Sequence, residues 1–105
     1  MPKYLFRASY TQDGLKRLIK EGGTARRDTV VKLIEGMGGK VEAFYYALGP
    51  DDVVAIGEMS EAQVVAISLT INSTGAVTLS TTKLLDPAEV DQATKISVDY
   101  RPPGK

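Results

Sequence analysis

The stretch KVEAFYYALGPDDVVAIGEMSEAQ, residues 40–63, decides the fold, because it contains two strand patterns joined by a turn. Residues 41–48 and 53–58 are rich in β-branched and aromatic side chains, which favour strands. Between them, Gly-Pro-Asp-Asp at 49–52 has the composition of a compact turn. The stretch therefore predicts two successive strands in the middle of the chain.

A helix signal follows directly after these strands. Ser60 and Gln63 match the S-x-x-Q capping box, in which each side chain bonds a backbone N–H of the first turn. We expect a helix that runs to about Asn72 and ends at the Ser-Thr-Gly stretch behind it. Its inward candidates at helical spacing are Val64, Ile67 and Ile71.

One strand and two helix signals precede the central stretch. Residues 3–10 alternate with the two-residue period of a strand. Thr11 or Asp13 can cap a short helix that the Gly22–Gly23 pair interrupts, and Thr24 can cap a second helix. This second helix carries an apolar stripe that stops at another glycine pair: Val30, Val31, Leu33, Ile34 and Met37.

The remainder of the chain predicts a fourth strand and a final helix. Residues 77–84 form a Thr-rich strand pattern. Asp86–Pro87 starts a short helix with proline in its first turn. Residues 101–105 form a tail whose two prolines cannot continue a helix.

The order of these elements is β-α-β-β-α-β with an added C-terminal helix. At 105 residues the chain has the size of one domain, which we expect to span residues 1–105. Two split βαβ halves give a four-stranded antiparallel sheet with its helices on one face. The predicted fold class is therefore α+β of the ferredoxin-like kind.

The central strands are apolar on both sides, which predicts a partner for the sheet. A sheet covered by helices on one face should alternate apolar and polar residues, yet residues 53–56 are apolar throughout. A second copy packed face to face would cover the remaining apolar face, so we expect a homodimer or a higher oligomer. The alternative is a monomer with half-exposed tyrosines. Strict alternation in residues 41–48 gives two largely apolar sets: Val41, Ala43, Tyr45 and Ala47, and Glu42, Phe44, Tyr46 and Leu48.

Composition excludes several classes of site. Thirteen basic and thirteen acidic residues cancel, which removes the broad positive field that non-specific nucleic-acid binding needs and leaves room only for a local basic patch. We expect no nucleic-acid partner. The absence of cysteine and histidine removes disulfides, thiolate and imidazole catalysis and the metal and haem sites that use them. We therefore expect no metal and no cofactor. Because we find no signal core and no apolar run near the ~20 residues of a membrane span, we expect no membrane partner and a cytoplasmic protein.

The predicted turn holds the first candidate site. Asp51 and Asp52 are adjacent carboxylates at a strand end, and their mutual repulsion could turn one of them into a general base. The alternative is ordinary turn chemistry with solvated charges. Asp52 is the stronger candidate because it directly precedes the apolar strand.

The second candidate site is the segment Gly22–Arg27. A glycine pair before a helix, followed by Arg26 and Arg27, could hold a phosphate or a carboxylate. The segment lacks the spacing of a nucleotide-binding loop. The alternative is a helix break followed by surface arginines.

The third candidate site consists of aromatic strand residues. On the sheet face toward the partner copy, tyrosine hydroxyls could line a cavity and orient a small apolar or anionic molecule, with phenylalanines as apolar walls. The alternative is that these rings only fill the interface. The tyrosines are Tyr4, Tyr10, Tyr45 and Tyr46, and the walls are Phe6 and Phe44.

Four segments of the chain resemble the bacterial GYD-domain family: MPKYLFRASY at the start, EGGTARR from residue 21, GGKVEAFYYALG from residue 38, and VDYRPPG near the end. The resemblance runs over nearly the whole chain. It implies a dimeric α/β barrel, in which two ferredoxin-like sheets pack together. In the naming motif, Gly49 and Asp52 match the family, and Asp51 stands where the family has a tyrosine.

Three functions are compatible with these observations. We expect a small-molecule binding or sensing module that assembles as a homo-oligomer, with a tyrosine-lined cavity between sheet and helices. One alternative is a cofactor-independent barrel enzyme, such as a monooxygenase or isomerase, using Asp, Tyr or Arg. Another is a purely structural assembly unit. An enclosed pocket with a carboxylate beside a tyrosine hydroxyl would favour the enzyme.

Overall fold

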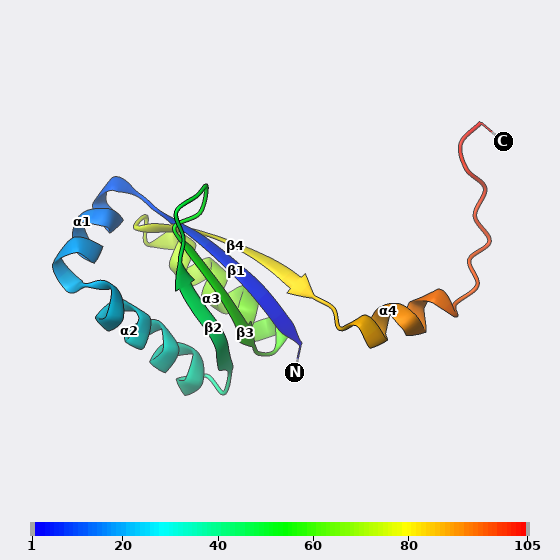
Figure 1. The fold of residues 1–105 in the computed structure, drawn as a ribbon, viewed down its shortest axis with the longest axis horizontal. Coiled ribbons are helices and arrows are strands. Elements are labelled where there is room, and N and C mark those ends of the chain that lie inside the picture. Colours follow the sequence, from blue (N-terminus) through cyan, green and yellow to red (C-terminus); the bar gives the residue numbers. More distant parts are fainter. Residues whose placement is uncertain (1, 105) are drawn as a thin grey trace.

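The computed structural model describes residues 2–104, and in this part of the chain four strands and four helices follow one another in the predicted order (Figure 1). The βαββαβ order with an added C-terminal helix is confirmed. The elements are β1 (Lys3–Tyr10), α1 (Gln12–Glu21), α2 (Gly23–Gly36), β2 (Lys40–Tyr46), β3 (Val53–Glu58), α3 (Glu61–Ser73), β4 (Val77–Leu84) and α4 (Pro87–Thr94).

The strands form one sheet in the order β2-β3-β1-β4. Every neighbouring pair is antiparallel, and β1 pairs with β4 along its whole length. The two halves of the chain thus interleave, since β1 lies between β3 and β4. This arrangement confirms the predicted α+β fold class of the ferredoxin-like kind.

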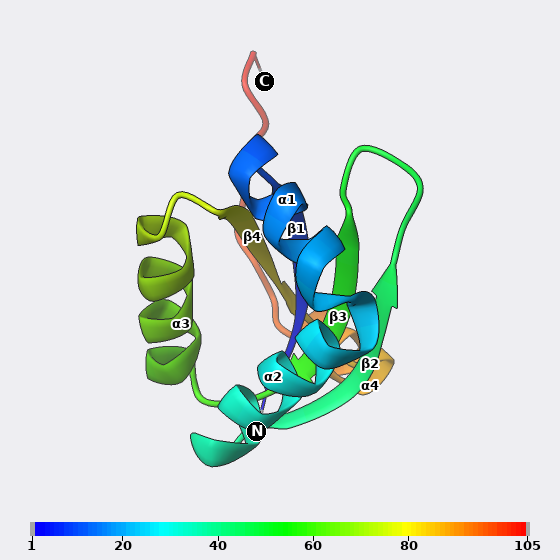
Figure 2. The ribbon, with the colours of Figure 1, turned by 90° about the vertical axis from the view of Figure 1, so that its left-hand side faces the viewer.

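Helices α1, α2 and α3 lie on one face of the sheet, as the turned view in Figure 2 shows. The core lies between them and the sheet. Tyr4 and Phe6 of β1 pack there with the buried Val64 and Ile67 of α3, and Ile71 packs against the same cluster. All three inward residues predicted for α3 are therefore confirmed. Within residues 2–104, no helix is long and apolar enough to cross a membrane.

A β-bulge in β2 corrects the predicted faces of that strand. The pairing with β3 shifts by one residue between Val41 and Ala43, which leaves Glu42 as an extra residue. Val41 and Phe44 therefore both pack against the helix-side core, although strict alternation puts them on opposite faces. Tyr46 lies on the helix side with Phe44. The prediction of two strictly alternating sets is wrong for this reason.

The starts of the first two helices agree only in part with the sequence signals. Thr11 caps α1, because its hydroxyl accepts a hydrogen bond from the N–H of Gly14. The predicted cap at Thr24 is wrong, since α2 already begins at Gly23. Gly22 stands at its N-cap with φ +90°, a conformation that glycine adopts without strain.

The C-terminal residues 86–104 form an arm that projects away from the sheet and its helices (Figure 1). Every residue of this arm is exposed. Its helix α4 is supported locally, because the Glu89 carboxylate accepts a hydrogen bond from the N–H of Asp86 at 3.2 Å. The radius of gyration is 17.4 Å, whereas a compact domain of this length has about 13 Å. The arm makes no core of its own.

Helix α1 approaches the start of β4 so closely that position 14 has room only for glycine. The carbonyl oxygen of Ala76 accepts hydrogen bonds from the N–H and the hydroxyl of Thr11, at 3.0 and 3.2 Å. A Cβ at Gly14 would overlap this same oxygen.

We expect Gly14→Ala to lower the free energy of unfolding by about 1–3 kcal/mol, because backbone must move to accept the methyl group. The matched change is Gly36→Ala in α2, where an added Cβ meets nothing within 4 Å. It should be neutral or stabilising by up to about 1 kcal/mol. Urea unfolding of both variants checks this, and equal stability of the two would contradict it.

Candidate functional site

An apolar space lies between the sheet and helices α2 and α3, and we call it the inner slot. Its volume is about 70 Å³, and in the part of the chain that the structure describes a single charged side chain, Arg26, borders it. Phe6 and Phe44 form two of its walls, and the bulge in β2 is what turns Phe44 to this side. The lining residues are Phe6, Ala8, Tyr10, Arg26, Val30, Ile34, Phe44, Val53, Ala55, Ile67, Ile71, Val77 and Leu79.

A wider and more polar space, the outer hollow, adjoins the inner slot. Its volume is about 240 Å³. Tyr10, Arg26, Ile71 and Val77 line both spaces, so they mark the boundary between the apolar interior and the surface. The other lining residues come from α1 and the segment between α3 and β4: Gly14, Arg17, Leu18, Glu21, Thr74 and Ala76.

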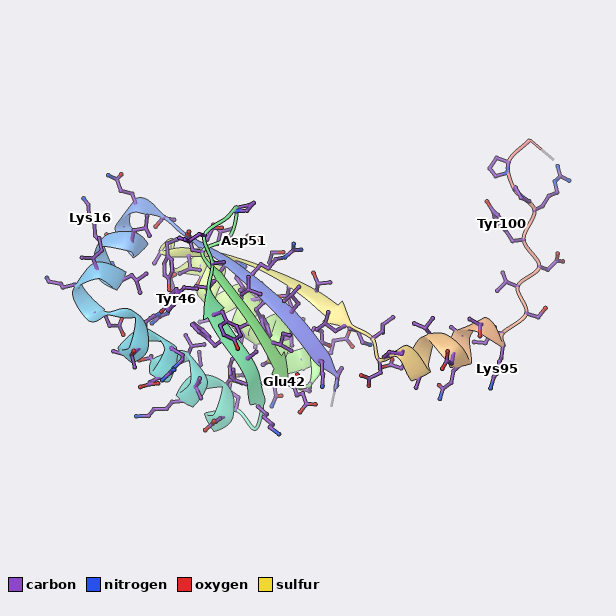
Figure 3. All side chains as sticks on the ribbon, viewed as in Figure 1. Lys16, Glu42, Tyr46, Asp51, Lys95 and Tyr100 are labelled. Carbon is purple, nitrogen blue, oxygen red and sulfur yellow. The ribbon has the colours of Figure 1, made fainter. Side chains whose placement is uncertain are left out.

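Tyr46 holds the start of α2 beside this boundary. Its hydroxyl donates a 2.9 Å hydrogen bond to the carbonyl oxygen of Gly23. A Cβ at Gly23 would lie 3.2 Å from the ring, so a larger residue there would push the ring outward by a few tenths of an ångström. Phe44 packs edge-on against the same ring, with 5.6 Å between centroids. Figure 3 shows Tyr46 between the end of β2 and the two N-terminal helices.

The surroundings of Tyr46 raise its pKa above the ordinary value of 10.0. Partial burial is the largest cause, because it disfavours the charged phenolate, and the neighbouring Tyr10 raises the pKa further. Arg26 acts in the opposite sense and lowers the pKa, as a nearby positive charge does. Tyr46 thus remains a neutral donor at physiological pH. We call Tyr10, Arg26 and Tyr46 the boundary cluster.

The two predicted arginines have different surroundings. Arg27 is exposed and pairs with Asp28, to which it donates hydrogen bonds at 2.9 and 3.2 Å. Arg26 is partly buried at the boundary, and within residues 2–104 it forms no ion pair. The structure therefore brings Arg26 to the tyrosines and leaves Arg27 outside the boundary cluster.

Asp52 connects three strands next to the site. Its carboxylate accepts a 2.8 Å hydrogen bond from the N–H of Tyr10. Its own N–H donates to the carbonyl oxygen of Ala8, and its carbonyl oxygen accepts from the N–H of Ala47, both at 2.8 Å. Asp52 is partly buried but does not line the slot or the hollow. Asp52 therefore supports the inner slot and the outer hollow indirectly, by holding the backbone of Tyr10.

The rest of the turn contributes less to this region. Strand β2 ends two residues earlier than predicted, because Ala47 already bonds the turn at Asp52. Gly49 is exposed, and a Cβ there would meet nothing within 4 Å. Asp51 accepts no hydrogen bond from the described residues of the chain. Of the matched motif positions Gly49 and Asp52, only the second contacts a wall of the site.

The strand tyrosines do not share the partner-facing side of the sheet. Tyr4 is buried in the core at 5% exposure, on the helix side. Tyr10 and Tyr46 also lie on the helix side, whereas Tyr45 is 70% exposed on the other face. Adjacent strand residues point to opposite faces, which separates Tyr45 from Tyr46. The space that Tyr10 lines therefore lies on the helix side, away from the face proposed for the partner copy.

Sequence reasoning missed Val77 and Glu21 as members of this site. Val77 lies opposite Tyr10 in the β1–β4 pairing, and no local pattern predicts which strands pair. Glu21 is the last residue of α1 and borders the outer hollow. The sequence signal that could have pointed to Glu21 is its position directly before the Gly22–Gly23 break.

The groups at this boundary are suited to binding a molecule with a polar end and an apolar end. A guanidinium donates several N–H bonds and a phenol donates or accepts one, while the inner slot offers apolar contact. Among the described residues, no group of three or more acidic side chains could hold a metal ion.

We expect Asp52→Ala to lower the free energy of unfolding by about 1–2 kcal/mol, because the N–H of Tyr10 loses a charged acceptor in a partly buried place. Asp51→Ala is the matched control and should stay within about 0.5 kcal/mol of wild type. Urea unfolding measures both. Identical unfolding curves for the two variants would show that the Asp52 carboxylate does not support Tyr10.

Comparison with known proteins gives one family. The family model of the GYD domain matches residues 4–94 of the chain. No curated protein and no solved structure matches it. The matched span contains the boundary cluster, Asp52 and, apart from Lys3 at the start of β1, the four strands. The resemblance noted in the sequence is therefore confirmed, and the chain belongs to the GYD-domain family.

Proposed function

We propose that this protein is a small-molecule binding or sensing module that works as a homo-oligomer in the cytoplasm. The observation that carries the proposal is the apolar inner slot, which opens at the boundary cluster. Small-molecule sites are mostly apolar concavities with a few convergent polar groups. The inner slot supplies the apolar part, Tyr10 and Arg26 supply the polar groups, and Tyr46 supports the helix turn that carries Arg26.

The arrangement favours binding over catalysis. Among residues 2–104, the one carboxylate that lines the outer hollow belongs to Glu21, which is exposed. A general base is most effective when it lies within hydrogen-bond reach of the reacting group in a site closed to water. An exposed carboxylate in an open hollow lacks that setting, whereas binding needs only the shape and the polar end of the site.

The face of the sheet opposite the helices supports the proposed assembly. This open face carries an apolar centre with charges of both signs around it. In a two-fold pairing the positive charges of one copy can meet the negative charges of the other, which makes the face self-complementary. Its apolar residues are Leu5, Ala43, Tyr45, Val54 and Ile56, and its charges are Lys3, Arg7, Glu42 and Glu58.

The arm gives a second reason to expect a partner copy. Val90, Ile96, Val98 and Tyr100 are each at least half exposed, and Tyr100 lies far from the sheet in Figure 3. Apolar side chains this far from the body of the chain gain no burial in a single copy. A second copy beside the open face would supply surface for the arm.

We expect protein purified from its own host to retain a small molecule, detected by native mass spectrometry as a mass that is lost on unfolding. Ile71→Trp should abolish this retention, because the larger ring fills the boundary that Ile71 lines. Leu69→Trp is the matched control, since Leu69 is 69% exposed on the same helix. Retention by both variants would place any ligand elsewhere and contradict the proposed site.

We expect a mass of at least twice 11.3 kDa by light scattering at micromolar concentration. Ile56→Glu should reduce it to the monomer mass, because a third carboxylate would join Glu42 and Glu58 in an interface. Val65→Glu on the exposed side of α3 is the control and should leave the mass unchanged. A monomeric wild-type protein with normal circular dichroism would contradict the proposed assembly.

A further inference from the structure

We infer that the ligand of the boundary cluster is a monocarboxylate with an apolar chain or ring. Its carboxylate would bond Arg26 in the outer hollow, and its apolar part would enter the inner slot. This inference rests on the proposed binding function and adds the chemical class of the ligand.

The first argument is the state of Arg26. Its guanidinium is partly buried at the edge of an apolar space, and among residues 2–104 it has no acidic partner within ion-pair distance. Removing a charge from water without a partner is unfavourable. An arginine in this setting is well suited to a carboxylate, which it can bind through two parallel N–H bonds.

The second argument is that the charge balance of the outer hollow favours a single negative charge. Arg17 also lines this hollow, but it pairs with Asp13 at 3.1 Å. Glu21 lines it too, and its carboxylate would repel a ligand that carries two negative charges. One unpaired guanidinium beside one carboxylate therefore fits a monoanion better than a phosphate.

The third argument is the geometry of the two spaces. The inner slot has about 70 Å³, several times the ~10–15 Å³ that a cavity needs to hold one water molecule. It accepts a short chain or the edge of a ring, and the outer hollow of about 240 Å³ takes the rest. Because Arg26 borders both spaces, a ligand held by its carboxylate can place its apolar end inside.

Tyr46 fixes this geometry without contacting the slot. Its hydrogen bond to Gly23 holds the first turn of α2, which carries Arg26. Tyr10 is held through its backbone by Asp52. Arg26 is therefore presented from a supported helix and Tyr10 from a paired strand, which reduces the ordering that binding would otherwise require.

The inference is tested by calorimetric titration of the full chain with three probes of equal chain length: octanoate, 1-octanol and octylammonium. Wild-type protein should bind octanoate at least tenfold more tightly than 1-octanol. Arg26→Gln should weaken octanoate binding by about ten- to a hundredfold and leave 1-octanol unchanged, as expected for loss of one charged hydrogen-bonding partner. Urea unfolding of this variant confirms that it folds.

Two further variants sharpen the test. Arg27→Gln removes the neighbouring arginine, which already pairs with Asp28, and should leave octanoate affinity within about twofold of wild type. Glu21→Gln removes the competing carboxylate and should strengthen octanoate binding severalfold.

The outcomes separate this inference from the function on which it rests. Equal binding of octanoate and 1-octanol, or an Arg26→Gln variant that binds octanoate normally, overturns the carboxylate ligand while the binding function stands. Preference for octylammonium overturns it as well and identifies Glu21 as the polar contact. Failure of all three probes to bind wild-type protein overturns both the ligand class and the apolar slot as its site.

Discussion

The bulge in β2 is the constraint on which the site depends. One extra residue at Glu42 changes the facing of the strand, so that Phe44 and Tyr46 both turn toward the helices. Tyr46 can then bond Gly23 and hold the first turn of α2. That turn carries Arg26 to the mouth of the inner slot. Without the bulge, the aromatic pair would face away from the helices, and α2 would lose this support.

The same bulge also shapes the opposite face. It leaves Glu42 beside Lys3 at 3.3 Å on the open face, where the two charges form an ion pair. Strict alternation predicted a largely apolar face. The open face instead combines apolar residues at its centre with charged residues around them. Such a surface resembles the apolar centre and polar rim of protein interfaces. The proposed ligand space on the helix side is thus separate from the proposed contact with a second copy.

Much of the architecture followed from local signals in the chain. Strands β1, β3 and β4 have the predicted bounds, and Ser60 with Gln63 forms the predicted capping box. The predictions failed where a contact distant in sequence outweighs a local preference. Thr24 is a good cap by residue type, but α2 already begins at Gly23, whose carbonyl oxygen accepts the hydrogen bond of the distant Tyr46. The prediction of strict alternation in β2 failed because a bulge arises from how β2 pairs with its neighbouring strand.

The candidate site likewise has one part that local sequence signals indicated and another part that only packing decides. Residue type and spacing indicated that Asp52, Tyr10, Tyr46 and an arginine pair deserved attention, since polar and aromatic groups at element ends are accessible and well supported. Only packing distinguishes Arg26 from Arg27. Successive helix residues point about 100° apart, so one guanidinium reaches the slot while the other pairs with Asp28 in solvent. Which of the two does so depends on how α2 lies on the sheet, and that is decided by contacts between segments far apart in the chain.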